Sequence, residues 1–195
     1  MTFLQSTLRT ITTLACLCAL SAHAQWKLDN DASDLRFVTT KNTNVAEVQQ
    51  FKRLAGELGS SGAVKLLIDL ASVETLVPLR NERLQTLLFD VAQFPTAQFE
   101  GVVDMGKVRG LAPGASADFD VEGKMTIRGK TQDAKAALRV VRLNNARLLV
   151  TTRAPILVNA AQFDLASGIE KLREIMGLPN IVGAVPVIFS LVFQK

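Results

Sequence analysis

Residues 117–128 read Ala-Asp-Phe-Asp-Val-Glu-Gly-Lys-Met-Thr-Ile-Arg, and apolar and polar side chains alternate strictly along them. Phe119, Val121, Met125 and Ile127 fall on one face, and the polar residues between them fall on the other. A period of two residues is that of a β-strand, because successive side chains of a strand point to opposite sides. The segment therefore predicts a strand with one face in an apolar core and the other in water.

The same alternation recurs along most of the chain. It is clear in three further segments, residues 35–39, 62–70 and 97–103, and strands are also predicted near residues 45–58, 134–142, 147–158 and 185–194, the last apolar on both faces. Turn signals separate these runs, including Arg128-Gly129-Lys130 and the Asn144-Asn145 pair, which suit hairpins. About eight short strands with such gaps predict a single all-β domain, either an antiparallel barrel or a sandwich.

Two short helices are predicted between the strands. Residues 78–89 place leucines at helical spacing, and Ser167-Gly168-Ile169-Glu170 has the pattern of a capping box in which Ser167 begins a helix. An apolar stripe that includes Leu172 and Met176 follows this box. We expect both helices to lie over the mouth of the barrel or against its flank.

The first 24 residues predict a cleaved export signal. Arg9 supplies a positive charge, residues 11–20 form a short apolar core, and Ala22-His23-Ala24 has the form of a cleavage site. The core is shorter than the roughly 20 residues that a membrane-spanning helix needs. A lipoprotein signal ending at Cys16 is the alternative, and its sequence fits that pattern less well. Residues 25–195 then form the mature domain.

Removal of residues 1–24 also removes both cysteines and the only histidine. We therefore expect no disulfide, no metal site built from Cys or His, and no Ser-His or Cys-His nucleophile. Asp118, Asp120 and Glu122 lie on the polar face of a predicted strand, where solvated carboxylates have near-normal pKa values. The protein is not expected to be an enzyme, and a hydrolase or isomerase that uses these carboxylates or Arg80 is a weaker alternative.

The charge of the chain does not indicate a nucleic-acid partner. Its 22 basic and 18 acidic residues give a formal charge of +4. Basic residues are interleaved with acidic ones, and no basic run or basic-aromatic pattern occurs. We expect neither nucleic acid nor a cofactor nor a metal to be bound.

Two motifs resemble those of a known family. Residues 80–99, RNERLQTLLFDVAQFPTAQF, resemble the signature of the YceI-like family, and residues 123–131, GKMTIRGKT, resemble its second hairpin motif. The segment from Trp26 to Phe37 is similar to the opening strand of that family, and the order of the three segments agrees. The resemblance implies a lipocalin-like antiparallel barrel in the bacterial periplasm, which binds a long apolar chain such as a polyisoprenoid in its interior. A homodimer is also common in the family.

The leading hypothesis is a periplasmic carrier for a long-chain isoprenoid or another lipid-like amphiphile. Burial of an apolar chain gains about 25 cal/mol per Å² without polar anchors. Small inward residues, Gly101, Gly123 and Ala97, are expected to leave room for it or to mark bends. Residues expected to line the interior are Phe37, Leu66, Ile68, Phe99, Val121, Met125 and Ile127, and those expected to close its mouth are Leu84, Phe89, Phe94, Leu172 and Met176.

The alternative is an exported interaction module whose barrel is filled by its own side chains and holds no small ligand. Its partner surfaces would be the helix at residues 166–176 and the apolar strand at residues 185–193. The two hypotheses differ in whether the interior is hollow.

Overall fold

The computed structural model describes residues 26–195, so the predicted export signal lies outside the described residues. The strands are β1 Trp26–Lys41, β2 Val45–Phe51, β3 Leu54–Leu58, β4 Ala63–Asp69, β5 Val73–Glu74, β6 Thr96–Val102, β7 Ser116–Ile127, β8 Lys130–Asn144, β9 Arg147–Thr152, β10 Ile156–Asn159 and β11 Ala184–Gln194. The α-helices are α1 Pro78–Arg83, α2 Met105–Arg109 and α3 Ala166–Ile175. Two 3-10 turns, η1 Leu70–Ser72 and η3 Ala160–Phe163, and a π-helical segment, η2 Leu84–Phe89, complete the chain.

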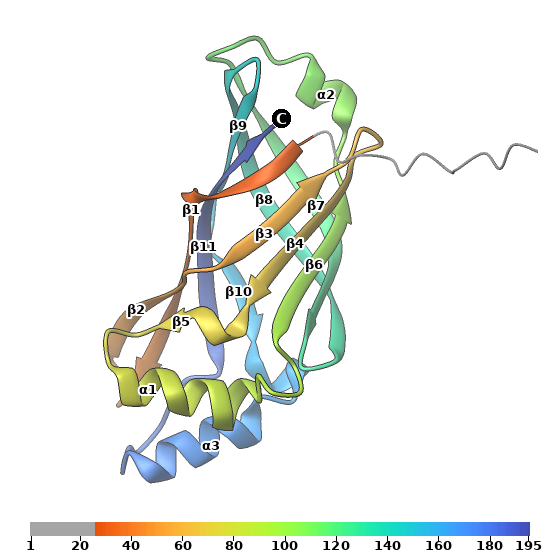
Figure 1. Ribbon diagram of the computed structural model, residues 1–195. Helices are drawn as coiled ribbons and strands as arrows, with labels where there is room; N and C mark the ends of the chain where they lie inside the picture. Colours follow the sequence, from red (N-terminus) through yellow and green to blue (C-terminus); the bar gives the residue numbers. More distant parts are fainter. Residues whose placement is uncertain (1–25) are drawn as a thin grey trace, which may run out of the picture.

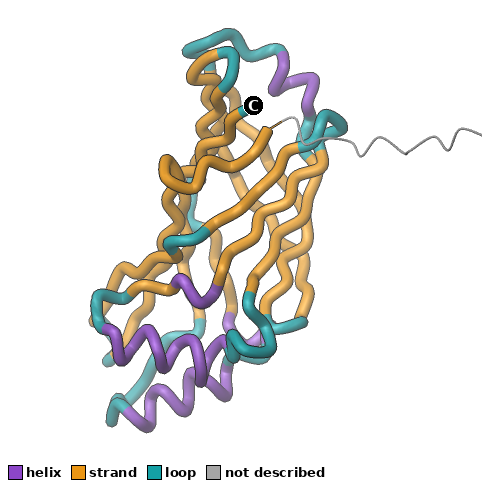
Figure 2. Tube along the Cα trace, viewed as in Figure 1, coloured by secondary structure: helices purple, strands orange, loops and turns teal. Residues whose placement is uncertain are grey.

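Eight strands form a closed barrel in which every pair of neighbours is antiparallel. They follow the order β11, β9, β8, β7, β6, β4, β3 and β1, and β1 pairs with β11 to close the ring. Figures 1 and 2 show the long strands running obliquely around one common interior. The predicted antiparallel barrel of about eight strands is confirmed.

Two predicted strands are each interrupted by a corner. Residues 45–58 divide into β2 and β3 because the backbone N–H groups of Lys52 and Arg53 bond to Ser72 of η1 instead of to a strand. Residues 147–158 divide into β9 and β10 at Pro155, which has no N–H to donate to a ladder. A register shift in β1 between Asp29 and Asp34 lets this strand leave β3 and pair with β2. The barrel therefore flares at the end where β2, β5 and β10 lie.

The predicted hairpins are present. Arg128 and Gly129 both have positive φ, 47° and 71°, and join β7 to β8 in a tight turn whose twist matches that of the strands. The turn between β8 and β9 holds Asn145 and Ala146, and the Asn144 side chain accepts a hydrogen bond of 2.8 Å from the N–H of Ala146.

The helices lie at the two ends of the barrel. Figure 1 shows α1 and α3 together at the flared end and α2 at the opposite end, near the C-terminus. The sequence did not predict α2, which has five residues and is capped by Asp104. Among residues 26–195, no helix has both the length and the apolar character needed to cross a bilayer.

The capping box predicted at Ser167 is wrong. Helix α3 begins at Ala166 with Leu165 at its N-cap, and no side chain caps it. The chain enters the helix directly from η3 through Asp164 in a left-handed conformation, and the N–H of Leu165 bonds to the carbonyl of Ala160. Because this turn already directs the chain into the helix, Ser167 falls within the first helical turn.

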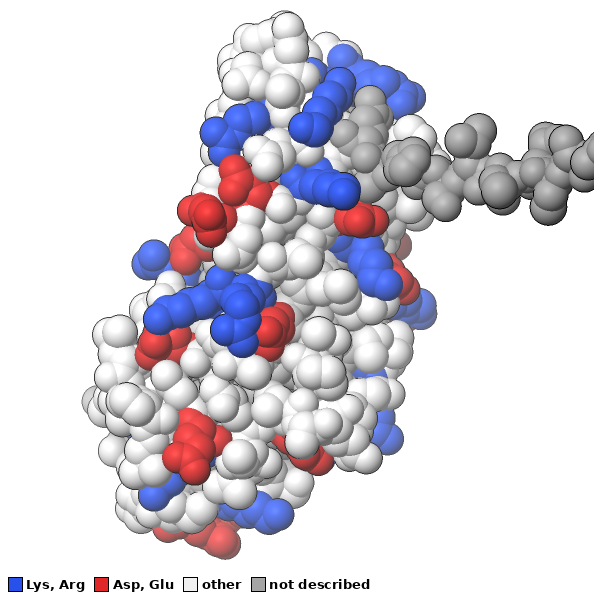
Figure 3. Space-filling view, viewed as in Figure 1, with Lys and Arg blue, Asp and Glu red and all other residues white. Residues whose placement is uncertain are grey.

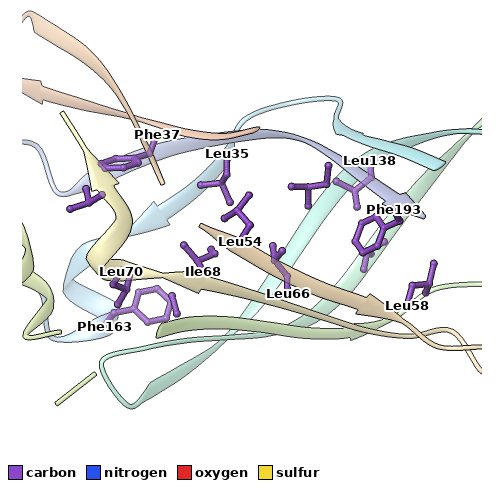
Figure 4. Packing of buried hydrophobic residues seen from close by; sticks show 14 of the residues in the cluster. Leu35, Phe37, Leu54, Leu58, Leu66, Ile68, Leu70, Leu138, Phe163 and Phe193 are labelled. Carbon is purple, nitrogen blue, oxygen red and sulfur yellow. The ribbon is translucent and has the colours of Figure 1, made fainter. Parts of the chain in front are cut away.

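The inner faces of the strands form the core. Figure 4 shows side chains such as Leu35, Leu66 and Phe193 projecting inward from the strands that carry them. At the α2 end this core is dense, and Trp26, Val108 and Leu148 are each at most 2% exposed. Side chains therefore seal this end of the barrel from water.

Candidate ligand-binding cavity

The barrel encloses a cavity with a volume of about 440 Å³, within the range of roughly 300–1,000 Å³ typical of small-molecule sites. All eight strands of the barrel contribute to its wall, and α1, η2 and α3 contribute at the flared end. Most of the wall is apolar. The cavity can therefore exclude water from a long hydrophobic molecule.

Eleven of the twelve residues expected to contact a ligand lie at this cavity. Those on β1, β4, β6 and β7 line its wall, and those on η2 and α3 lie at its flared end. They are Phe37, Leu66, Ile68, Leu84, Phe89, Phe99, Val121, Met125, Ile127, Leu172 and Met176.

Phe94 does not line the cavity, and its expected place at the mouth is corrected. Its N–H bonds to the carbonyl of Asp90, and its ring packs beside the β7–β8 turn. The guanidinium carbon of Arg128 lies 5.8 Å from the ring centroid, and a Cβ on Gly129 would lie 3.3 Å from the ring. Phe94 therefore joins the 90–95 loop to this hairpin.

The inward glycines do not enlarge the cavity. Gly101 on β6 is directly opposite Gly123 on β7, and the ring of Phe99 lies against both. Neither glycine contributes to the cavity wall, whereas Ala97 does. The expectation that these glycines leave room for a ligand is therefore wrong, because an aromatic side chain of the same sheet uses that space.

The sequence did not predict the lining residues of the second half of the barrel. They share an inward position on β8, β9 and β11 and include Leu138, Val140, Leu148, Val150, Val187, Phe189, Leu191 and Phe193. The alternation was visible on β8, but β11 is apolar on both faces. Register decides its inner face, because Leu35 is paired with Phe189 and Phe37 with Val187, and paired residues point to the same side.

Polar side chains gather at the flared end of the cavity. Thr39 and Lys41 come from β1, and Glu47 and Gln49 come from β2. Glu47 accepts from Lys41 Nζ at 3.0 Å. Arg80 on α1 donates to the other oxygen of the same carboxylate at 2.8 Å. The cavity therefore has one polar end and a long apolar remainder.

Close helix packing covers the flared end. A Cβ placed on Gly168 of α3 would lie 2.7 Å from the carbonyl oxygen of Leu87 in η2. The helices can approach this closely only because position 168 has no side chain. Leu172 on α3 and Leu84 on η2, both less than 10% exposed, then extend the apolar wall of the cavity.

The carboxylates considered for catalysis lie outside the barrel. Asp118 accepts hydrogen bonds from Arg139, which lower the pKa of this carboxyl. Glu122 pairs with Lys135 at 2.6 Å, and Asp120 is exposed. Residues 26–195 contain no cluster of three side chains suited to hold a metal ion. Basic and acidic groups are also mixed on the face shown in Figure 3.

A closed antiparallel barrel around an apolar cavity defines a lipocalin-like binding protein. The sequence model of the YceI-like domain matches residues 26–193, and the chain belongs to this family. No curated protein matches the chain significantly.

Solved structures agree with this assignment. A polyisoprenoid binding domain from Saccharophagus degradans, implicated in plant cell wall breakdown, is 36% identical with a TM-score of 0.86, and the match covers 88% of this chain and 99% of that domain. BcnA from Burkholderia cenocepacia is 22% identical, with a TM-score of 0.66 and coverages of 85% and 98%. The YCEI protein of Campylobacter jejuni is 15% identical, with a TM-score of 0.52 and coverages of 75% and 84%, and these last two show the fold alone.

Proposed function

We propose that this protein binds a long-chain isoprenoid or another lipid-like amphiphile inside the barrel and carries it through the periplasm. The observation that carries the proposal is the apolar cavity of about 440 Å³ within a closed sheet. The 36% identical domain from Saccharophagus degradans, described as polyisoprenoid binding, supports the same class of ligand. The periplasmic location rests on the export signal expected in residues 1–24.

The driving force for such binding is burial of apolar area. Each Å² of apolar ligand surface removed from water gains about 25 cal/mol, part of which offsets the loss of ligand freedom. A flexible chain can follow a cavity whose wall is built from Leu, Val, Phe and Met side chains, because none of these requires a directed bond. The filled-barrel alternative predicts no such space, and the cavity therefore favours the carrier.

Extraction of the purified protein tests the proposal. Protein isolated from its native host is treated with organic solvent, and the extract is analysed by mass spectrometry. We expect an amphiphile in near-stoichiometric amount. The Met125→Trp variant, whose indole would enter the cavity, serves as the matched control and is expected to release much less. Equal extracts from the two proteins, or none from either, would contradict a ligand in the barrel.

A further inference from the structure

The flared end of the cavity carries more positive than negative charge. Lys41, Arg80 and Arg83 all line it, and Glu47 is the only carboxylate among the described residues that does. Glu47 is already shared by Lys41 and Arg80 through its two oxygens. One carboxylate therefore faces three cations, which leaves two positive charges in excess at this end.

Of the three cations at the flared end, Arg83 alone has no side-chain partner within residues 26–195. It lies one helical turn after Arg80, so that the two side chains share a face of the helix and reach the same cavity. Within residues 26–195 it forms neither an ion pair nor a side-chain hydrogen bond, whereas Arg80 forms both with Glu47. Its guanidinium has a planar set of donors that suits a carboxylate or a phosphate.

A second observation at the same end also indicates a polar ligand group. Gln49 is only 4% exposed and lines the cavity, and its amide makes a single hydrogen bond, to Thr39 Oγ1 at 3.0 Å. The amide oxygen is buried and has no partner. Because the Thr39 hydroxyl can donate as well as accept, the amide can also turn its NH₂ group toward a ligand. In that orientation the amide oxygen accepts from the Thr39 hydroxyl, and the buried NH₂ group needs an acceptor, which an anionic ligand group supplies.

From these contacts we propose that the amphiphile has an anionic head, a carboxylate or a phosphate, which binds beside Arg83 at the flared end. The inference rests on the proposed function and adds the chemistry and orientation of the ligand. Arg83 supplies the principal charge, and Gln49 supplies a hydrogen bond. The ion pairs of Glu47 with Lys41 and Arg80 join β1, β2 and α1 around the head. The apolar tail then extends away from the helices, toward the end of the barrel that α2 covers.

Displacement of the neutral fluorescent probe N-phenyl-1-naphthylamine tests this proposal with pairs of ligands that share a tail. Oleate is compared with oleyl alcohol, and farnesyl phosphate is compared with farnesol. We expect the anionic member of at least one pair to bind about tenfold more tightly, the ratio typical of a hydrogen bond to a charged group. The pair that shows the larger ratio distinguishes a carboxylate from a phosphate head.

The variant Arg83→Gln should bring this ratio close to one while the affinity for the alcohols stays the same. Arg36→Gln removes the same charge from an exposed position outside the cavity and should preserve the ratio. Lys41→Gln should also reduce it, and this variant provides the measurement if Arg83→Gln does not fold.

Equal affinities for acids and alcohols in the unaltered protein, or a ratio that stays the same in both cavity variants, would overturn the anionic head and leave the carrier proposal intact. If the probe itself does not bind, both proposals fail.

Discussion

The ring of Phe99 on β6 rests directly on Gly123 of β7: a Cβ placed on that glycine would lie only 2.6 Å from the Cζ atom of the ring. A Cβ placed on Gly101, directly opposite Gly123, would lie 3.0 Å from the Cζ atom of the same ring. The two glycines therefore form a notch in the wall that receives an aromatic side chain. This notch holds Phe99 flat against the sheet, so that its ring forms part of the cavity wall without blocking the interior.

Gly123→Ala is expected to destabilise the protein. The added methyl overlaps both the Phe99 ring and the carbonyl of Glu100, and the ring has to move into the cavity. Overpacking of this kind costs about 1–3 kcal/mol, which urea denaturation can measure. Gly59→Ala is the matched control, because its nearest atom would be at 3.6 Å, and it should change the free energy of unfolding little. Equal effects of the two substitutions would contradict the notch.

Met125→Trp is expected to weaken ligand binding more than it weakens the fold. Met125 lines the cavity, and the larger indole side chain of the variant can extend into unoccupied volume. Fluorescence of N-phenyl-1-naphthylamine should show at least about a tenfold loss of affinity, with little change in Tm. In a filled core the same ring would instead destabilise the protein by roughly 1–3 kcal/mol. Lys124→Trp places the ring on the exposed side of the same strand and should leave binding unchanged.

Gly168→Ala is expected to loosen the closure of the flared end. The methyl group would collide with the backbone of Leu87, so that α3 is pushed away from η2. We expect faster release of N-phenyl-1-naphthylamine in stopped-flow measurements, together with a lower Tm. Ala166→Gly weakens the intrinsic preference of the same helix without a new contact, and it serves as the control. If release is equally fast in both variants, general fraying of α3 and not the collision controls exit.

Glu74 links β5 to the start of α1, and its contribution to stability should depend on pH. It accepts hydrogen bonds from Asn81 Nδ2 at 3.0 Å, Lys52 Nζ at 2.7 Å and the N–H of Leu76 at 2.7 Å. These bonds, the one from Asn81 foremost, lower the pKa of Glu74 from 4.5 to about 2. Because the folded pKa lies below the unfolded one, the stabilisation is present above pH 4.5 and is lost as the pH falls toward 2.

Glu74→Gln should therefore lower the free energy of unfolding most clearly above pH 4.5, and the difference from the unaltered protein should shrink as the pH approaches 2. Urea denaturation across this range measures it. Glu100→Gln removes a carboxylate that pairs with Lys65 at 3.5 Å on the exposed surface, and it should give only a small, weakly pH-dependent change. A Glu74→Gln effect that is constant with pH would show that shape and not charge matters at this position.

Sequence alone determined the strands and, for most of them, which face is inside. The period of two is a local property, so Phe119 and Val121 reveal an inner face without reference to the rest of the chain. Composition also showed that the chain after residue 24 contains neither Cys nor His, so that no disulfide and no Cys or His nucleophile is available there. The period of 3.6 likewise indicated helices near residues 78–89 and 167–176, although their starting turns depend on contacts that the pattern does not contain.

Tertiary structure alone decided what the inside of the barrel became. Closure of β1 on β11 selected the inner face of β11, and the Phe99 ring used the space that Gly101 and Gly123 offered. Pairing of β2 with β5 brought Glu47 to Arg80, 33 positions away in the chain. The physical reason is that a local pattern fixes the direction of a side chain, whereas a cavity and its polar end depend on the summed volumes and register of strands far apart in the sequence.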